Sequence, residues 1–198
     1  DRKTLAPGGL VAENNHIHHY SRWKPVYCAG IRLDGVGNRA AHNLIHDAPH
    51  MAIGFSGNDQ VIEYNEIHHV VTQSNDAGAL YCGYNWSMRG NEVRFNYLHD
   101  ISGYEGKGCV GVYLDDQFSS ARIFGNLFVR VASAAFIGGG HGSTIENNVF
   151  VECSPAVHID ARGLGWQADS TNRLMRTVTE MPYAAEPWRS RYPTLAGI

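Results

Sequence analysis

The chain has 198 residues, a formal net charge of −3 at pH 7 and an apolar fraction of 43%, enough to bury one substantial core. Charged residues make up only 18%, and the basic ones are scattered, so the composition gives no electrostatic support for binding nucleic acid or an anionic membrane. No apolar run approaches the roughly 18 residues that a membrane-spanning helix needs.

The most regular feature of the sequence is an Asn followed two residues later by a large apolar residue. It occurs six times, at Asn15/Ile17, Asn43/Ile45, Asn65/Ile67, Asn96/Leu98, Asn126/Phe128 and Asn148/Phe150. The intervals between these Asn residues are 28, 22, 31, 30 and 22 residues. This spacing is too irregular for a helical repeat of fixed period but suits the turns of a parallel β-helix. We therefore predict an all-β solenoid of about six coils.

Each coil is predicted to contain three short strands whose apolar residues alternate inward. The first strand ends on the column that follows the Asn. The second supplies two inward columns, Ile31, Ile53, Leu80, Val112, Phe136 and Val157, then Leu33, Phe55, Cys82, Leu114, Gly138 and Ile159. The third passes through Ala40, Ile62, Val93, Ile123 and Ile145. Each Asn is expected at a corner of this triangular prism, in the left-handed backbone conformation and with its amide stacked on the Asn of the next coil.

A column of histidines on the first strand and two of the four cysteines are interpreted as structural. His18, His46, His68 and His99 form an outward column on the first strand. Because a linear row of imidazoles converges poorly on one tetrahedral ion, we expect hydrogen-bonded or solvated rings, no metal site and no cofactor. Of the four cysteines, Cys82 and Cys153 fall in apolar columns, whereas Cys28 and Cys109 lie in loops and pair only if those loops meet.

The outward positions of the second strand carry most of the chemistry. In coil order they are Arg32 and Asp34, Gly54 and Ser56, Tyr81 and Gly83, Tyr113 and Asp115, Ile137 and Gly139, and His158 and Asp160. Long loops over residues 21–29, 71–78 and 102–110, and longer corners after the second strand in coils 3 and 4, predict a groove with this strand as its floor. Aromatic side chains along such a groove suit stacking on sugar rings. The residues predicted to bind substrate are Tyr81, Trp86, Tyr104, Tyr113, His141, His158 and Arg162.

Carboxylates on this face are the catalytic candidates. Asp115, which Asp116 follows, shares a column with Asp160, and Gly139 lies between them. Two coil steps place them about 9.6 Å apart, close to the ~6.5–9.5 Å of inverting glycosidases, and Gly139 would leave room for substrate. Accepting backbone N–H groups at strand ends is the structural alternative. Asp76 lies about seven residues up-strand, more than ~20 Å from Asp115 unless its loop folds back.

After Trp166 the repeat is no longer visible, which divides the chain into a β-helix over residues 1–165 and a C-terminal extension over residues 166–198. Asp169 or Ser170 can cap a short helix that Pro182 ends. Its apolar residues at helical spacing are Leu174, Met175, Val178 and Met181. The helix is expected to cover an open end of the prism, unless it contacts a continuation of the chain.

Three segments carry a resemblance to a known family: Asp76-Ala77-Gly78-Ala79-Leu80-Tyr81, Tyr113-Leu114-Asp115-Asp116 and His158-Ile159-Asp160-Ala161-Arg162-Gly163. They resemble the right-handed parallel β-helix proteins of bacterial polysaccharide breakdown, and within these glycoside hydrolase family 141, over about Val11 to Trp166. The resemblance implies a secreted or periplasmic enzyme with fucosidase or xylanase activity on plant cell-wall glycans. It also implies a catalytic pair of Asp76 with Asp115 or Asp116, whereas the register favours Asp115 with Asp160. Family members are longer than this chain.

We therefore expect a glycoside hydrolase that acts on a polysaccharide or oligosaccharide, with one Asp as acid and another as base or nucleophile. A polysaccharide lyase or epimerase would instead need a base and a cation such as Lys107, Arg32, His158 or Arg162. A non-catalytic carbohydrate-binding module is the third alternative. The sequence leaves the sugar, the linkage and the oligomeric state open.

Overall fold

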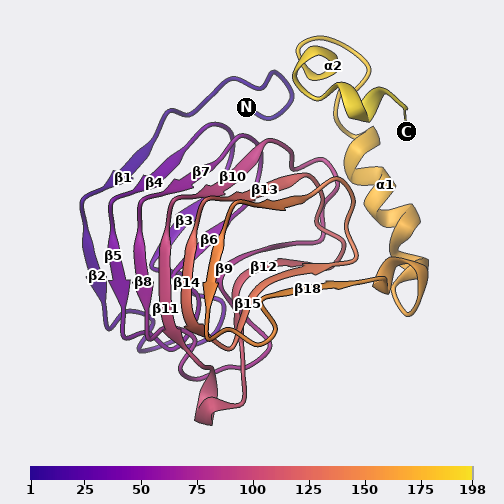
Figure 1. Ribbon diagram of the computed structural model, residues 1–198. Coiled ribbons are helices and arrows are strands. Elements are labelled where there is room, and N and C mark those ends of the chain that lie inside the picture. Colours follow the sequence, from indigo (N-terminus) through magenta and orange to yellow (C-terminus); the bar gives the residue numbers. More distant parts are fainter. Residues whose placement is uncertain (198) are drawn as a thin grey trace.

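The computed structural model describes residues 1–197 and contains three parallel sheets of six strands each. The chain passes through the three sheets in turn, one strand in each, and then begins the next coil (Figure 1). The prediction of an all-β parallel β-helix of six coils is confirmed. No helix among residues 1–197 is long and apolar enough to cross a membrane.

The three sheets are here named A, B and C. Sheet A consists of β1 (Val11–Glu13), β4 (Arg39–Ala41), β7 (Val61–Glu63), β10 (Asn91–Arg94), β13 (Ala121–Phe124) and β16 (Thr144–Glu146). Sheet B consists of β2 (His16–His18), β5 (Leu44–His46), β8 (Glu66–His68), β11 (Tyr97–Ile101), β14 (Leu127–Val131) and β17 (Val149–Val151). Sheet C consists of β3 (Ile31–Leu33), β6 (Ile53–Phe55), β9 (Gly78–Gly83), β12 (Val110–Asp115), β15 (Ser133–Gly138) and β18 (Val157–Asp160).

The inward columns of sheets A and B match the sequence prediction. In sheet B the paired residues are Ile17, Ile45, Ile67, Leu98, Phe128 and Phe150. In sheet A they are Ala40, Ile62, Val93, Ile123 and Ile145, and Ala12 of β1, which was not part of the prediction, extends this column. The middle members of both columns are fully buried, so each coil contributes to one continuous apolar core.

In coil 5 the predicted register of sheet C is wrong by one residue. Ala135 pairs with Val112, and Ile137 pairs with Leu114, so these two residues face the core. Phe136 and Gly138 therefore lie on the outer face, where the prediction had placed Ile137 and Gly139. Small residues occur at both alternating positions of β15, so hydrophobic periodicity alone favours the larger Phe136 for the core. Outside, the Phe136 ring instead stacks between two other rings, as described below.

Stacked asparagines fix one corner of every coil. Each Nδ2 donates to the Oδ1 of the Asn in the next coil, at 2.8 to 3.0 Å along the whole series from Asn15 to Asn148. The backbone N–H of each Asn donates to the same Oδ1. The predicted amide ladder is therefore confirmed. Because four of the six side chains are almost fully buried, these bonds form away from competing water.

The left-handed backbone does not lie at these asparagines, contrary to the prediction. It lies at the preceding residue of every coil, at φ values of 54° to 64° for Asn14, His42, Tyr64, Phe95, Gly125 and Asn147. The Asn side chain can thus point inward to the ladder while the preceding residue makes the turn. Gly125 is needed for a further reason, because a Cβ there would lie 2.7 Å from the Phe95 ring.

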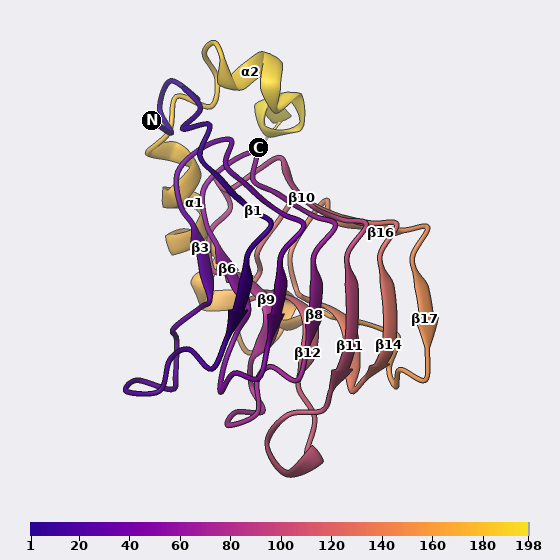
Figure 2. The same cartoon turned by 90° about the vertical axis from the view of Figure 1, so that its left-hand side faces the viewer.

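The predicted long connections between sheets B and C are present in coils 1, 3 and 4, over residues 19–30, 69–77 and 102–109. They project together from one corner of the prism, at the bottom of Figures 1 and 2. The connection over residues 102–109 contains the short helix η1 (Tyr104–Gly106). All four cysteines are free thiols, so Cys28 and Cys109 are not paired.

The predicted C-terminal helix is present as α1 (Thr171–Thr179), but it does not cover the end of the prism. It follows two short 3-10 helices, η2 (Arg162–Leu164) and η3 (Ala168–Ser170), and buries Leu174 and Val178 beside Trp86 on the flank of the solenoid. The expected position is wrong because Trp86, in the enlarged corner of coil 3, provides an apolar surface there. The last coil stays open, and Ile159 on its inward column is 66% exposed.

The C-terminal segment continues from α1 back to the first coil. It forms α2 (Trp188–Arg191) and η4 (Pro193–Gly197), which lie next to the N-terminal residues in both views (Figures 1 and 2). The Trp188 indole Nε1 donates to the carbonyls of Arg2 and Lys3 at 2.9 and 3.1 Å. The segment therefore spans the length of the solenoid and links both ends of the chain.

The ladder predicts how much a central asparagine contributes to stability. Replacing Asn96 with Ala removes the acceptor for two donors of Asn65 in the core, and a buried donor without a partner costs about 1–3 kcal/mol. We expect Asn96→Ala to lower the free energy of unfolding by about 2–4 kcal/mol in urea denaturation. As a control, Asn15→Ala at the exposed start of the ladder should cost about 1 kcal/mol or less. Equal losses would contradict the ladder's role.

Candidate functional site

Four rings form a continuous row on the outer face of sheet C. Tyr81, Tyr113, Phe136 and His158 occupy one column of the strand register, one from each of β9, β12, β15 and β18. Tyr81 meets Tyr113 edge to face at 5.6 Å between ring centroids. Phe136 stacks on Tyr113 at 4.8 Å and on His158 at 4.1 Å. The sequence analysis did not place Phe136 in this row, because it assigned the wrong register to coil 5. An aromatic residue in the coil between those of Tyr113 and His158 could have indicated the row.

A cavity of about 340 Å³ opens on this row near the start of the strands and is here called the Asp76 cleft. Its lining comprises Asn75, Asp76, Gly108, Cys109, Val110, Tyr113, Ala132, Ser133, Phe136, Ser154, Pro155 and His158. The Asp76 side chain is exposed, and within residues 1–197 its carboxylate makes no hydrogen bond or ion pair. A free carboxylate thus faces the same cleft as three members of the aromatic row, and it can accept hydrogen bonds from a ligand.

At the other end of the strands, Arg162 lies between the predicted catalytic carboxylates. Its Nη1 is 2.6 Å from Asp115 Oδ1, and its Nη2 is 2.8 Å from Asp160 Oδ2. Asp116 Oδ1 is 3.7 Å from Nη1. Arg162 is only 8% exposed, and its guanidinium lies 5.1 Å from the centroid of Phe136. One buried cation therefore joins three carboxylates to the aromatic row.

The guanidinium occupies the space that was expected to admit substrate. The corrected register places Gly138, not Gly139, between Asp115 and Asp160. A Cβ at Gly138 would lie 2.7 Å from the Arg162 Cζ. The glycine is therefore required for the approach of Arg162, and the predicted gap between the two carboxylates is filled by the protein itself.

Hydrogen bonds hold this cluster in one arrangement. Asp115 accepts from the Tyr81 hydroxyl at 2.8 Å and from the Asp116 backbone N–H at 2.7 Å, in addition to Arg162. Burial and the bond to Asp115 raise the pKa of Tyr81 well above its usual value, so Tyr81 remains a donor. The Gln167 amide donates to Asp116. Asp115 is thus a structural acceptor at a strand end, the alternative role considered from the sequence.

Arg162 keeps Asp160 ionised. Partial burial acts to raise the pKa of the Asp160 carboxyl, but hydrogen bonds from Arg162 and its charge outweigh burial and hold this pKa below its usual value. A glycosidase acid needs the opposite change, because it must carry a proton at working pH. The geometry therefore suits Asp160 to the role of base or ion-pair partner, not of acid.

A second cavity, of about 390 Å³, borders Asp160 and is here called the Trp86 cleft. His141 also lines it and meets the Trp86 indole edge to face at 5.0 Å. Trp86 is only 6% exposed, and its backbone N–H donates to Thr177 of α1. The C-terminal segment thus covers most of the Trp86 ring, which was predicted as an open wall of the groove. Tyr104, predicted for the opposite wall, is exposed on η1 and lines neither cleft.

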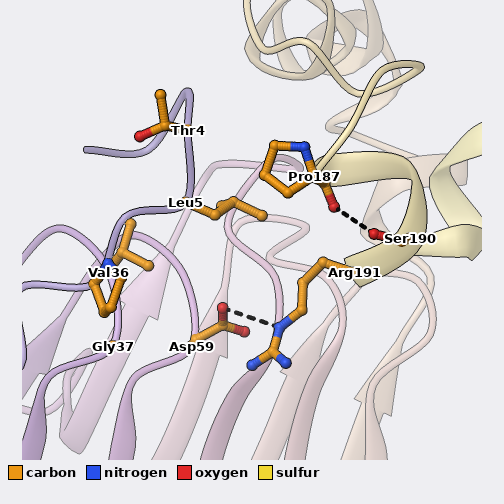
Figure 3. Close-up of a pocket in the computed structure, with 9 residues that line it drawn as sticks. Thr4, Leu5, Val36, Gly37, Asp59, Pro187, Ser190 and Arg191 are labelled. Atoms are coloured by element: carbon orange, nitrogen blue, oxygen red, sulfur yellow. Dashed lines mark hydrogen bonds and ion pairs between the residues drawn. The ribbon is translucent and has the colours of Figure 1, made fainter.

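A larger cavity, of about 590 Å³, lies away from these residues, between the N-terminal segment, the first coils and α2 (Figure 3). Leu5, Val36 and Pro187 contribute apolar walls, and the Arg191 Nε is 3.2 Å from Asp59 Oδ2. None of the predicted site residues lines this cavity. It is the space where the two terminal segments meet the solenoid.

Comparisons of the chain with protein families, with curated proteins and with solved structures found no significant match.

The arrangement around Arg162 predicts a pH-dependent loss when this cation is removed. Arg162→Met leaves the buried Asp115 carboxylate and the partly buried Asp160 carboxylate without their cation. This substitution should lower the free energy of unfolding by about 3–5 kcal/mol at pH 7. Because the folded pKa of Asp160 lies below the value of about 3.9 for an unfolded chain, its contribution is present above pH ~4 and is lost as the pH falls. The difference from wild type should therefore narrow below pH ~4.

Denaturant titrations between pH 3 and pH 7 measure this difference. The matched control is Arg122→Met, which breaks the exposed Arg122–Glu146 pair and should cost less than about 1 kcal/mol. A difference for Arg162→Met that stays constant with pH would contradict the proposed charge pairing.

Proposed function

We propose that the protein binds a polysaccharide or oligosaccharide along the outer face of sheet C. The observation that carries this proposal is the row of four rings from Tyr81 to His158, which continues over four coils and opens into the Asp76 cleft. Sugar rings present C–H faces that pack on aromatic side chains, and their hydroxyls need hydrogen-bonding groups nearby.

The polar groups around the row support the same ligand. Asp76 provides a carboxylate without a partner of its own in residues 1–197, and His158 is exposed at the end of the row. Both can exchange hydrogen bonds with hydroxyl groups. The long connections at this corner, over residues 69–77 and 102–109, border the Asp76 cleft and give it depth. The resemblance to polysaccharide-degrading β-helix proteins implies action on a glycan outside the cell, and secretion is part of the proposal on that basis.

Substitutions in the row test glycan binding. Phe136→Ala and His158→Ala should each weaken binding of xylan or fucosylated oligosaccharides by about two- to tenfold, since an aromatic contact contributes about 0.5–1.5 kcal/mol. Affinity electrophoresis and titration calorimetry measure this change. Phe95→Ala is the matched control, because Phe95 stacks in a separate ring row with Tyr64 and is also partly exposed. Unchanged affinity in both row variants, or an equal loss for Phe95→Ala, would exclude this surface.

Hydrolysis is the second candidate function, and Asp160 is the observation that favours it. Its carboxylate is ionised by Arg162 and borders the Trp86 cleft, where it could act as base or nucleophile. The geometry provides no matching acid at the Trp86 cleft among the predicted carboxylates, because Asp115 is buried against Arg162 and Asp76 lines the other cleft. Binding without turnover is therefore the function that the geometry supports better.

Release of reducing sugar distinguishes the two functions. We expect the wild type to bind glycans without releasing sugar, and we expect no release of sugar from Asp76→Asn, Asp115→Asn or Asp160→Asn. Release by the wild type that one Asp variant abolishes, with affinity retained, would establish a hydrolase and identify a catalytic carboxylate. Products that absorb in the ultraviolet would instead indicate a lyase, because elimination leaves an unsaturated sugar.

A further inference from the structure

The outer face of sheet B carries a second cluster of side chains that could bind a ligand, separate from the proposed glycan surface on sheet C. Stacked imidazoles follow β2, β5, β8 and β11, with ring centroids 5.2 Å apart for His18 and His46, 4.7 Å for His46 and His68, and 4.7 Å for His68 and His99. An imidazole column alone does not surround an ion. At one point, however, a carboxylate from the same face joins it.

Glu66, His68 and His99 each offer one ligand atom, and these atoms all lie within 4.8 Å of one another. Glu66 and His68 are two residues apart on β8, so both point outward, and His99 on β11 is paired with His68. The His99 Nε2 is 3.3 Å from Glu66 Oε1. The Glu66 carboxylate therefore approaches the ligand space from a side on which the imidazole column has no ligand atom.

His99 is held so that one ring nitrogen faces this space. Its Nδ1 is 2.7 Å from Asp100 Oδ2, and Arg130 binds the Asp100 carboxylate through Nε at 2.6 Å and Nη2 at 2.9 Å. A carboxylate fixed by arginine accepts, so Nδ1 donates, and Nε2, 3.3 Å from Glu66 Oε1, is the ring nitrogen that faces the space between the three residues. A carboxylate behind a histidine is the usual support of a metal-binding imidazole in proteins.

Little movement is needed to complete the set. The ligands of a tetrahedral ion with bonds of about 2.0–2.1 Å lie about 3.3 Å apart. The Glu66 side chain is 50% exposed and can rotate toward His68 and His99. His68 Nδ1 lies 2.8 Å from His69 Nδ1, and in the tautomer in which the His68 Nδ1 donates, its Nε2 keeps a lone pair for an ion.

The neighbouring histidine pair is different and serves as an internal comparison. His16 Nε2 and His46 Nε2 are 2.6 Å apart, so one donates directly to the other and the lone pair is already used. The Nδ1 of His46 is engaged by Asp47 at 2.7 Å. The His16–His46 pair therefore has no ring nitrogen of His46 left for an ion, whereas the group at Glu66 does offer ligand atoms.

We propose that Glu66, His68 and His99 bind a divalent transition ion of the zinc type, with water at the fourth position. Two imidazoles and one carboxylate are a donor set that zinc accepts. Asp100 is a positioning residue that acts through His99. The expectation of no metal site considered only the imidazole column and did not include Glu66.

Titration of the chelator-treated full chain with Zn²⁺ tests the proposal, and Co²⁺ provides a second readout through its visible absorption when tetrahedral. One Zn²⁺ per chain should bind. His99→Ala and Glu66→Gln should each weaken binding by about 100-fold or more, and Asp100→Asn by about 10- to 100-fold. His16→Ala, two coils away in the same face, should retain affinity within about twofold.

Circular dichroism and thermal unfolding show that each variant is folded, and Zn²⁺ should raise the melting temperature of wild type but not of Glu66→Gln. Glu66 is exposed, so this variant avoids a change in the core. Absence of Zn²⁺ binding by the wild type would overturn the proposal, as would equal loss in His16→Ala or full affinity in His99→Ala.

Discussion

Hydrogen bonding between stacked asparagines is the constraint on which the rest of this structure depends. Each buried amide donates to the next coil and accepts from the previous one, from Asn15 to Asn148. A buried donor must find an acceptor, so the ladder holds one corner of every coil in register whatever the loop lengths elsewhere. Coils of 22 to 31 residues can therefore superimpose, and their outward residues become neighbours in space.

This register creates two faces with different chemistry from the same repeat. On sheet C it aligns aromatic rings and collects three carboxylates around Arg162. On sheet B it aligns imidazoles and brings Glu66 beside His99. In both cases a charged residue outside the main column decides the chemistry. Arg162 neutralises the Asp115–Asp160 pair, which would otherwise resemble a catalytic acid and base. Glu66 adds a carboxylate oxygen to the row of imidazoles, so that three ligand atoms lie close together.

The C-terminal segment covers part of the predicted groove as well as the flank of the solenoid. Leu174 and Val178 of α1 bury Trp86, which removes an aromatic wall from the predicted groove, and Trp188 hydrogen-bonds the segment to the N-terminal residues Arg2 and Lys3. Packing along the flank leaves the inward columns of the last coil partly exposed, with Ile159 among them. The accessible rings that remain are therefore Tyr81, Phe136 and His158 of the row, because Tyr113 is only 5% exposed.

The sequence by itself determined the coil number, the inward columns of sheets A and B, the ladder and the long loops, because each depends on a local period that buried and exposed residues must obey. Only the tertiary structure decided that Phe136 faces outward, since β15 has small residues at both alternating positions. It alone placed Arg162 against Asp115, 47 residues away, and α1 on the flank. Those contacts join distant segments whose packing no local period encodes.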